Sequence, residues 1–180
     1  QLIANVVAVV NDELANKVVE EVNKTAEESE KQTLSAKVLK AIVDTEPDKM
    51  DIINDDVKDT MIEQTIESAK NQQEGTGIEQ TQDMTSIVSD IIVKADSETA
   101  AKIIDEVNET ETDSNLSLKV ISGISEKDNG KLDTLSENNK EQIEKLTETA
   151  IKNADASEES AQLIAKVVAV ASDELVNKVV

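Results

Sequence analysis

QLIANVVAVVNDELANKVV, at residues 1–19, returns near the end of the chain as QLIAKVVAVASDELVNKVV, at residues 162–180. Fifteen of the nineteen positions are identical, and the four differences are Asn5 to Lys166, Val10 to Ala171, Asn11 to Ser172 and Ala15 to Val176. The two copies begin 161 residues apart, so the chain holds one full period and the beginning of another. Self-similarity at a fixed long period is typical of stacked supersecondary units.

A weaker copy of this stretch divides the period into two half-units. Residues 87–104 align with residues 2–19 at an offset of 85 and with residues 163–180 at an offset of 76. After a three-residue deletion the offset becomes 82, so that Lys49 aligns with Lys131. We therefore expect two half-units that share one apolar framework and differ in loop length.

The apolar side chains of residues 2–10 recur at the i, i+1, i+4, i+5 spacing of a helix face and do not strictly alternate with polar ones. Valine-rich runs also suit strands, so a strand stays open as the alternative. Asn11 or Asp12 is expected to cap the next helix, with Asp12 and Glu13 placing negative charge on its first turn. The apolar face of that helix consists of Leu14, Val18, Val19 and Val22. Two helices with one apolar face each can form a hairpin.

The rest of the first half-unit repeats this plan with a longer second arm. A third helix is predicted from Leu34 to Val43, followed by a stop and restart at which Thr45 is the cap. Pro47, the one proline, is placed in the first turn of the fourth helix, where its missing N–H is not needed. That helix is expected to run without interruption to about Asn71.

The second half-unit is predicted to contain the same helices with different turns. We expect a break at 95–97, a helix over Leu116–Ile124, a break at 128–130 and a last long helix over 131–153. Asn138 and Asn139 weaken the apolar stripe of that helix, which predicts a bend or a polar contact there. Ser157 is expected to cap the helix that follows. The predicted units are a hairpin (1–31), a hairpin (32–71), a linker (72–85), a hairpin (86–114), a hairpin (115–153) and the start of the next repeat (154–180).

Four hairpins in one period predict units of about 40 residues, the range of two-helix solenoid repeats. Burying a Val or Ile contributes about 1.5–3 kcal/mol, whereas ordering each residue costs about 1–2 kcal/mol, so a lone hairpin without aromatic side chains is not stable. The expected fold is all-α: a right-handed or superhelical α-solenoid of stacked hairpins. In hairpin length and apolar spacing the chain resembles the HEAT-like class, and DSETAAKIIDEV (96–107) resembles the acidic helical N-terminal domain of magnesium channels. These resemblances imply architecture and no functional residue.

Composition excludes several classes of function. The net charge is −21, and the 180 residues include no His, Cys, Phe, Trp or Tyr, while every basic residue is Lys. Nucleic-acid binding requires clustered cations, and attraction to an anionic membrane surface requires them too. General acid–base catalysis near neutral pH usually uses His, and no thiol nucleophile exists. No apolar run approaches the roughly 18 residues that span a bilayer. We expect no enzyme, no catalytic residue, no cofactor-binding residue, no nucleic-acid partner and no membrane insertion.

Two kinds of site remain as alternatives to a solvated acidic surface. Asp55-Asp56 and the loop Glu109–Asp113 carry the oxygen ligands of a hard cation such as calcium, although no metal ligand is predicted. Ser125–Glu137 approaches the EF-hand pattern, but Lys127 stands in a ligand position, which rejects it. The glycosylation sequons begin at Asn23, Asn108 and Asn115, the first two at equivalent positions of the half-units.

The favoured hypothesis is a structural, non-enzymatic segment of a long acidic solenoid, acting as a filament, scaffold or spacer. Repeats that stack end to end make heterologous contacts that do not close, so the expected partner is the chain itself. The alternative is a solenoid that binds another protein or a peptide. The high charge favours a soluble protein at the cell surface or outside the cell. Because an open reading frame begins with Met and not Gln1, we expect a longer or processed protein, with a sequence close to EEVNKT after Val180.

Overall fold

The computed structural model describes residues 2–27, 33–73, 83–110, 116–154 and 157–170. Every element in these ranges is a helix, and none of these residues lies in a β-strand. The elements of the first half-unit are α1 (Leu2–Val9), α2 (Asp12–Ala26), α3 (Leu34–Thr45), the 3₁₀ helix η2 (Pro47–Ile52) and α4 (Asp55–Gln73). The elements that follow are α5 (Met84–Lys94), α6 (Ser97–Thr110), α7 (Leu116–Lys127), α8 (Asn129–Asn138), α9 (Lys140–Asn153) and α10 (Glu158–Val170).

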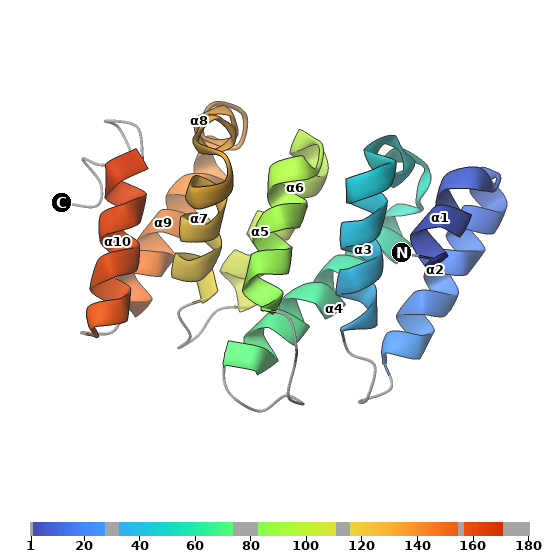
Figure 1. Cartoon of the computed structure of the whole chain (residues 1–180), viewed down its shortest axis with the longest axis horizontal. Helices are drawn as coiled ribbons and strands as arrows, with labels where there is room; N and C mark the ends of the chain where they lie inside the picture. Colours follow the sequence, from blue (N-terminus) through green and yellow to red (C-terminus); the bar gives the residue numbers. More distant parts are fainter. Residues whose placement is uncertain (1, 28–32, 74–82, 111–115, 155–156, 171–180) are drawn as a thin grey trace.

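The helices form two rows that lie against each other. In the first row α1, α3, α5, α7 and α10 follow one another, and each contacts the next. In the second row α2 contacts α4, α4 contacts α6, and α6 contacts α9. Figure 1 shows the first row along the long axis of the molecule, with α1 at one end and α10 at the other. The two ends of the row therefore lie far apart.

Helices α2 and α6 begin after side chains that cap their first turns. Asn11, rather than Asp12, is the N-cap of α2, and its Oδ1 accepts a hydrogen bond from the Leu14 N–H at 3.0 Å. Asp96 occupies the equivalent position in the second half-unit, and its Oδ1 accepts from the Thr99 N–H at 2.9 Å. Residues 2–9 form a helix, so the strand alternative is wrong.

The fourth helix is interrupted, which the sequence did not predict. Pro47–Ile52 is a 3₁₀ helix, Ile53 is extended (φ −74°, ψ 129°), and α4 begins at Asp55. The cause lies in α2. Asn16 donates from Nδ2 to the Ile52 carbonyl at 2.9 Å, and its Oδ1 accepts from the Asn54 N–H at 2.6 Å. These bonds engage the backbone groups that a continuous helix would pair internally.

Thr45 does not cap the restart, contrary to the prediction. It is the last residue of α3, and its Oγ1 donates back to the Ala41 carbonyl at 2.7 Å. Glu46 precedes η2 without making a side-chain capping bond, and Pro47 stands at the start of η2 as predicted. The fixed φ of proline, rather than a hydroxyl, therefore starts this helix.

The last long helix is also divided. The bend predicted at Asn138 and Asn139 is a complete break, since α8 ends at Asn138 and α9 begins at Lys140. α8 starts two residues before the predicted Lys131, with Asp128 as its N-cap. Ser157 accepts from the Ser160 N–H at 3.1 Å and so caps α10 as predicted.

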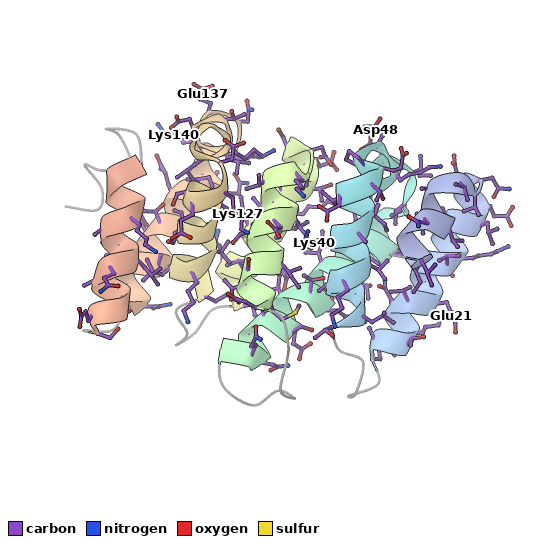
Figure 2. All side chains as sticks on the ribbon, viewed as in Figure 1. Glu21, Lys40, Asp48, Lys127, Glu137 and Lys140 are labelled. Atoms are coloured by element: carbon purple, nitrogen blue, oxygen red, sulfur yellow. The ribbon has the colours of Figure 1, made fainter. Side chains whose placement is uncertain are left out.

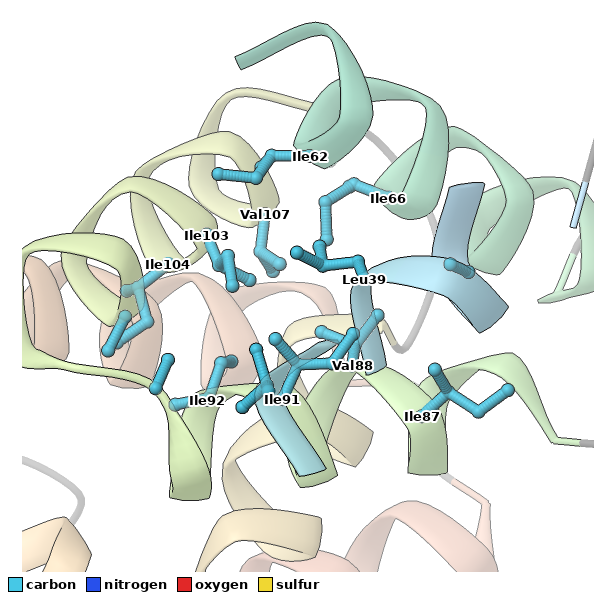
Figure 3. Packing of buried hydrophobic residues seen from close by; sticks show 14 of the residues in the cluster. Leu39, Ile62, Ile66, Ile87, Val88, Ile91, Ile92, Ile103, Ile104 and Val107 are labelled. Atoms are coloured by element: carbon cyan, nitrogen blue, oxygen red, sulfur yellow. The ribbon is translucent and has the colours of Figure 1, made fainter. Parts of the chain in front are cut away.

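One apolar core runs between the two rows. Figure 3 shows its middle, where Leu39 of α3, Ile66 of α4, Ile91 of α5 and Ile103 of α6 lie together. Each of these side chains is no more than 1% exposed. Complete burial of such a side chain contributes roughly 1.5–3 kcal/mol, so neighbouring hairpins supply the stability that one hairpin lacks.

Helices α5 and α7 approach closely at Gly123. A Cβ atom added there would lie 2.4 Å from Ser89 Oγ and 2.9 Å from Ser89 Cβ. The Ser89 hydroxyl lies 3.2 Å from the Val120 carbonyl oxygen of α7 and 3.0 Å from the Thr85 carbonyl oxygen of its own helix. Two small residues therefore allow the two backbones to meet at this crossing.

Candidate functional site

Two buried hydroxyl groups, those of Thr65 and Thr147, donate hydrogen bonds to the backbone of their own helices. Thr65 donates to the Met61 carbonyl at 2.7 Å, and Thr147 donates to the Ile143 carbonyl at 2.8 Å. Both bonds connect a side chain to the residue one turn earlier in its own helix, which is the usual way to satisfy a hydroxyl inside a helix.

Among the carboxylates considered for a cation, Asp55 is paired with two lysines. Asp55 and Asp56 lie in the first turn of α4, where negative charge is stabilised by the helix dipole. Asp55 Oδ1 lies 3.4 Å from Lys102 Nζ and 3.5 Å from Lys58 Nζ. The hydrogen bond from Lys102 is the main reason why the pKa of Asp55 lies below its usual value. Across the described residues, no three acidic side chains are grouped as metal ligands would be.

The other two cation candidates can be placed only in part. In the loop Glu109–Asp113, only Glu109 and Thr110 belong to the described residues, at the end of α6. Lys127, which occupies a ligand position in the rejected EF-hand pattern, lies 2.8 Å from Asp90 Oδ1 and donates to Ser86 Oγ at 3.1 Å. Lys127 therefore joins α7 to α5.

Two of the three sequon asparagines are buried. Asn23 is 6% exposed and Asn108 is 8% exposed. Asn23 donates to the Val57 carbonyl at 2.8 Å, and Asn108 donates to the Gln142 carbonyl at 3.2 Å. Each acceptor is the third residue of its helix, α4 or α9, so the two bonds are structural equivalents. Asn115 lies outside the described residues.

A pair of lysines makes equivalent bonds between hairpins. Lys49 donates to the Val10 carbonyl at 3.3 Å, and Lys131 donates to the Ala95 carbonyl at 2.9 Å. Each carbonyl lies at the break after a first-row helix, α1 or α5, where no helical N–H is available to it. The lysine of one hairpin thus satisfies the turn of the preceding hairpin in both half-units.

Lysines and carboxylates also connect the first row along its surface. We call the set Asp44, Lys40, Asp90, Lys94, Lys127, Glu126 and Lys166 the lysine–carboxylate ladder. Lys40 of α3 lies 3.5 Å from Asp90 Oδ2 of α5, and Lys127 of α7 reaches the other oxygen of the same carboxylate. Figure 2 labels these two lysines on either side of α5. At the end of the row, Lys166 of α10 lies 2.6 Å from Glu126 of α7.

Within the ladder, the pKa values of Lys40 and Asp44 are shifted toward the charged forms. Burial works against the charge of Lys40, but the hydrogen bonds and charges of Asp44 and Asp90 outweigh it, so the pKa of Lys40 is raised. Burial works against the charge of Asp44 as well, and hydrogen bonds from Lys40 and Lys94 outweigh it, so the pKa of Asp44 is lowered. Through Asp90 and Lys94, these two groups also pair with residues of the neighbouring helix α5.

Two hollows in the described surface are open to solvent and more polar than apolar. One, of about 280 Å³, lies between α2 and α4 beside Ala26, Gln64 and Asn71. Another, of about 260 Å³, lies between α4 and α6 and is lined mainly by carboxylates, with Lys102 as its one cation. Neither combines apolar walls with a few convergent polar groups, as small-molecule sites usually do.

The exposed apolar surface gathers at one end of the rows. The large hydrophobic side chains that are exposed among the described residues are Leu2, Val6, Val9 and Leu14. We call Leu2, Val6 and Val9 together the α1 face. Leu2 is 83% exposed and Val6 is 44% exposed, whereas the equivalent residues of α5, Ile87 and Ile91, are 4% and 1% exposed. In α5 this position is covered because α3 packs on it.

Sequence reasoning missed the lysine bonds and the ladder, although one signal was present. Lys49 aligns with Lys131 at an offset of 82, while Val10 aligns with Ala95 at an offset of 85. The lysine and the break residue both recur in the second half-unit, although the offset between the half-units changes from 85 to 82 between them. This joint recurrence indicates a contact between the lysine and the break residue. The ladder has no comparable signal, because the equivalent residues Asn5, Asp90 and Lys166 differ in charge.

None of the described helices combines the length and the apolar character that crossing a membrane requires. Comparisons of the chain with protein-family models, with curated proteins and with solved structures give no match.

Proposed function

We propose that this chain is a segment of a long, acidic, non-enzymatic α-solenoid that acts as a filament, scaffold or spacer, exposed at the cell surface. The observation that carries the proposal is the repetition of the same contacts in both half-units. Lys49 and Lys131 bond to equivalent breaks, and Asn23 and Asn108 bond to equivalent turns. A contact that joins the two hairpins of each half-unit can recur in further half-units of the same kind.

The shape of the rows supports an open assembly rather than a closed one. The row from α1 to α10 does not return on itself (Figure 1). Apolar side chains are exposed on α1 and α2, at the beginning of the rows, where a preceding hairpin would cover them. An interface that joins one end of a molecule to the other end of the next gives a linear array.

A solenoid that binds a protein or peptide along its length is the alternative hypothesis. Such a module usually presents apolar anchors within a groove. In the residues that the structure describes, the large exposed hydrophobic side chains lie on α1 and α2, away from the middle of the rows. This placement favours the structural role.

Electron microscopy and light scattering of the purified chain, over a range of concentrations, test the proposal. We expect linear assemblies that lengthen with concentration, with an axial repeat of about 40 Å if packed helices are spaced ~8–10 Å apart. Discrete monomers at all concentrations would contradict it. A proteome-wide pull-down that recovers one stoichiometric partner on monomeric chain would favour the binding module.

A further inference from the structure

Helices α1 and α10 have almost the same sequence but different surroundings. Residues 1–9 and residues 162–170 differ at one position of nine, where Asn5 is replaced by Lys166. α10 packs on α7, and Leu163 is partly buried against the core. Leu2, the equivalent of Leu163 in α1, is 83% exposed. The structure therefore contains a covered and an uncovered copy of one helix.

We propose that the α1 face binds α7 of a second copy of this chain, in the place that α10 occupies on its own α7. The proposal rests on the proposed function and names the contact that joins the copies. Copies linked in this way form a head-to-tail chain, because each molecule offers α1 at one end and α7 near the other.

The choice of α7, rather than α3, follows from sequence and from position. Residues 1–9 and residues 86–94 share no identical residue at any of the nine aligned positions. Residues 86–94 belong to α5, which packs on α3. α3 contacts α1 on one side and α5 on the other, so it lies inside the row. α10 has one neighbour in the first row, α7, and is the helix that another molecule can replace without opening the row.

The one difference between the two helices affects a surface charge pair. Lys166 Nζ lies 2.6 Å from Glu126 Oε1, and both side chains are about half exposed (54% and 52%). Asn5 stands at the position of Lys166 and cannot form this pair. An exposed ion pair changes an equilibrium by only a few fold, so α1 fits the same place with slightly lower affinity.

Competition between α1 and α10 determines how strongly the unmodified chain associates. The molecule's own α10 follows α8 and α9 in the same chain and already packs on α7, so a second copy must compete with an intramolecular contact. We therefore expect the unmodified chain to associate weakly, and to associate more strongly when the charge at residue 126 favours α1 over α10.

Cross-linking of the full chain tests the geometry, since the chain has no cysteine of its own. A chain with Asn5→Cys is mixed with a chain with Glu126→Cys and treated with a short bismaleimide. The intramolecular reference is Lys166→Cys combined with Glu126→Cys. The background control mixes Asn5→Cys with Glu21→Cys, an exposed position of α2. We expect the 5–126 product to exceed the control at least tenfold, and equal yields would overturn the proposal.

A charge exchange tests the competition. The double variant Asn5→Lys with Lys166→Glu places a lysine in α1, where it can pair with Glu126 of a second copy. It also places a glutamate in α10, which repels Glu126 of the same molecule. We expect its association constant, measured by sedimentation velocity, to rise about three- to tenfold over the unmodified chain. Adding Glu126→Lys places a positive charge at residue 126, which repels the new lysine of α1 and attracts the new glutamate of α10. Association should therefore return to the starting level or below. All three residues are exposed, so folding is preserved.

The two experiments separate this inference from the proposed function. Linear assemblies without a 5–126 cross-link would leave the structural role in place and show that another surface joins the copies. A specific 5–126 cross-link in dimers that never extend would support the contact between α1 and α7 and contradict the filament. An association constant unchanged by the charge exchange would overturn the assignment of α7 as the partner surface.

Discussion

Asn23 and Asn108 show how one residue type is used at the same place in both half-units. Each lies in a second-row helix, is almost completely buried, and donates to a carbonyl in the first turn of the next second-row helix. The sequence marks both as sequons, and the structure assigns them to packing. A buried amide that already donates to the backbone is not available to carry a glycan.

Replacing Asn23 with Ala removes a buried hydrogen bond between α2 and α4. We expect the free energy of unfolding to fall by about 1–2 kcal/mol, because the Val57 carbonyl loses a partner and is not hydrated. Urea denaturation followed by circular dichroism measures the change. Asn138→Ala, at an exposed position of α8, is the matched control and should be within about 0.5 kcal/mol of the unmodified chain. Equal stability of the two variants would mean that the Asn23 bond contributes nothing.

Replacing Gly123 with Ala tests the close crossing of α5 and α7. The new Cβ would lie 2.4 Å from Ser89 Oγ, so the helices must separate. We expect a loss of about 1–3 kcal/mol in urea denaturation, more than the gain in helix propensity. Gly130→Ala is the control, since its added Cβ meets only Asp128 Oδ1, at 3.3 Å. A Gly123→Ala variant as stable as Gly130→Ala would show that the crossing relaxes at no cost.

Among the elements, helices end where a neighbouring hairpin reaches their backbone. Asn16 of α2 engages Ile52 and Asn54, and this separates η2 from α4. Lys49 and Lys131 engage the breaks after α1 and α5. The lysine–carboxylate ladder joins the same first-row helices at the surface. Polar bonds between hairpins thus meet the backbone at these breaks, and at Ile52 and Asn54 they accompany a break that local signals did not predict.

The ladder predicts a dependence of stability on acid pH. The pKa of Asp44 in the folded chain lies below its ordinary value of 3.8. The stabilisation is therefore present above that value and is lost as the pH falls through the folded pKa, where the carboxylate takes up a proton. We expect Asp44→Asn to reduce stability by a few tenths to about 1 kcal/mol at pH 6, and the difference to shrink as the pH falls below 3.8 toward the lowered folded pKa.

Denaturation of Asp44→Asn and of the unmodified chain, at a series of pH values, measures this difference. Asp51→Asn, at an exposed residue of η2, is the control and should show a smaller effect at pH 6. A difference for Asp44→Asn that stays constant from pH 6 to pH 3 would exclude the ion pairs as its source.

Across the whole molecule, equivalent residues have different roles because of their position in the row. Leu2 and Val6 are exposed at the end of the row, whereas Ile87 and Ile91 are buried within it. These two positions are apolar in both helices. Only the presence of α3 beside α5 makes these positions part of the core.

This difference predicts opposite results for the same substitutions. The double variant Leu2→Asp with Val6→Asp should keep the free energy of unfolding within about 1 kcal/mol of the unmodified chain. It should also abolish concentration-dependent association, measured by sedimentation velocity. Ile87→Asp with Ile91→Asp should unfold the chain, because two buried carboxylates without partners are introduced. Association that survives the first pair of substitutions would show that the α1 face takes no part in it.

The sequence by itself determined that the chain is helical, where its first-row helices lie, and that the apolar framework repeats. The reason is that helix periodicity, caps such as Asn11 and Ser157, and internal alignment are local or pairwise properties of the residues. The first break, after Val10, follows from these signals alone, and so does the weak point at Asn138 and Asn139.

Only the tertiary structure decided how the hairpins meet. The end of η2, the burial of Asn23 and Asn108, and the pairing of Lys127 with Asp90 each depend on a residue about 30 to 40 positions away. A polar side chain has the same local sequence signal whether it faces water or a backbone group of the next hairpin. The neighbouring hairpin, which removes the water, makes the difference between a solvated residue and a structural one.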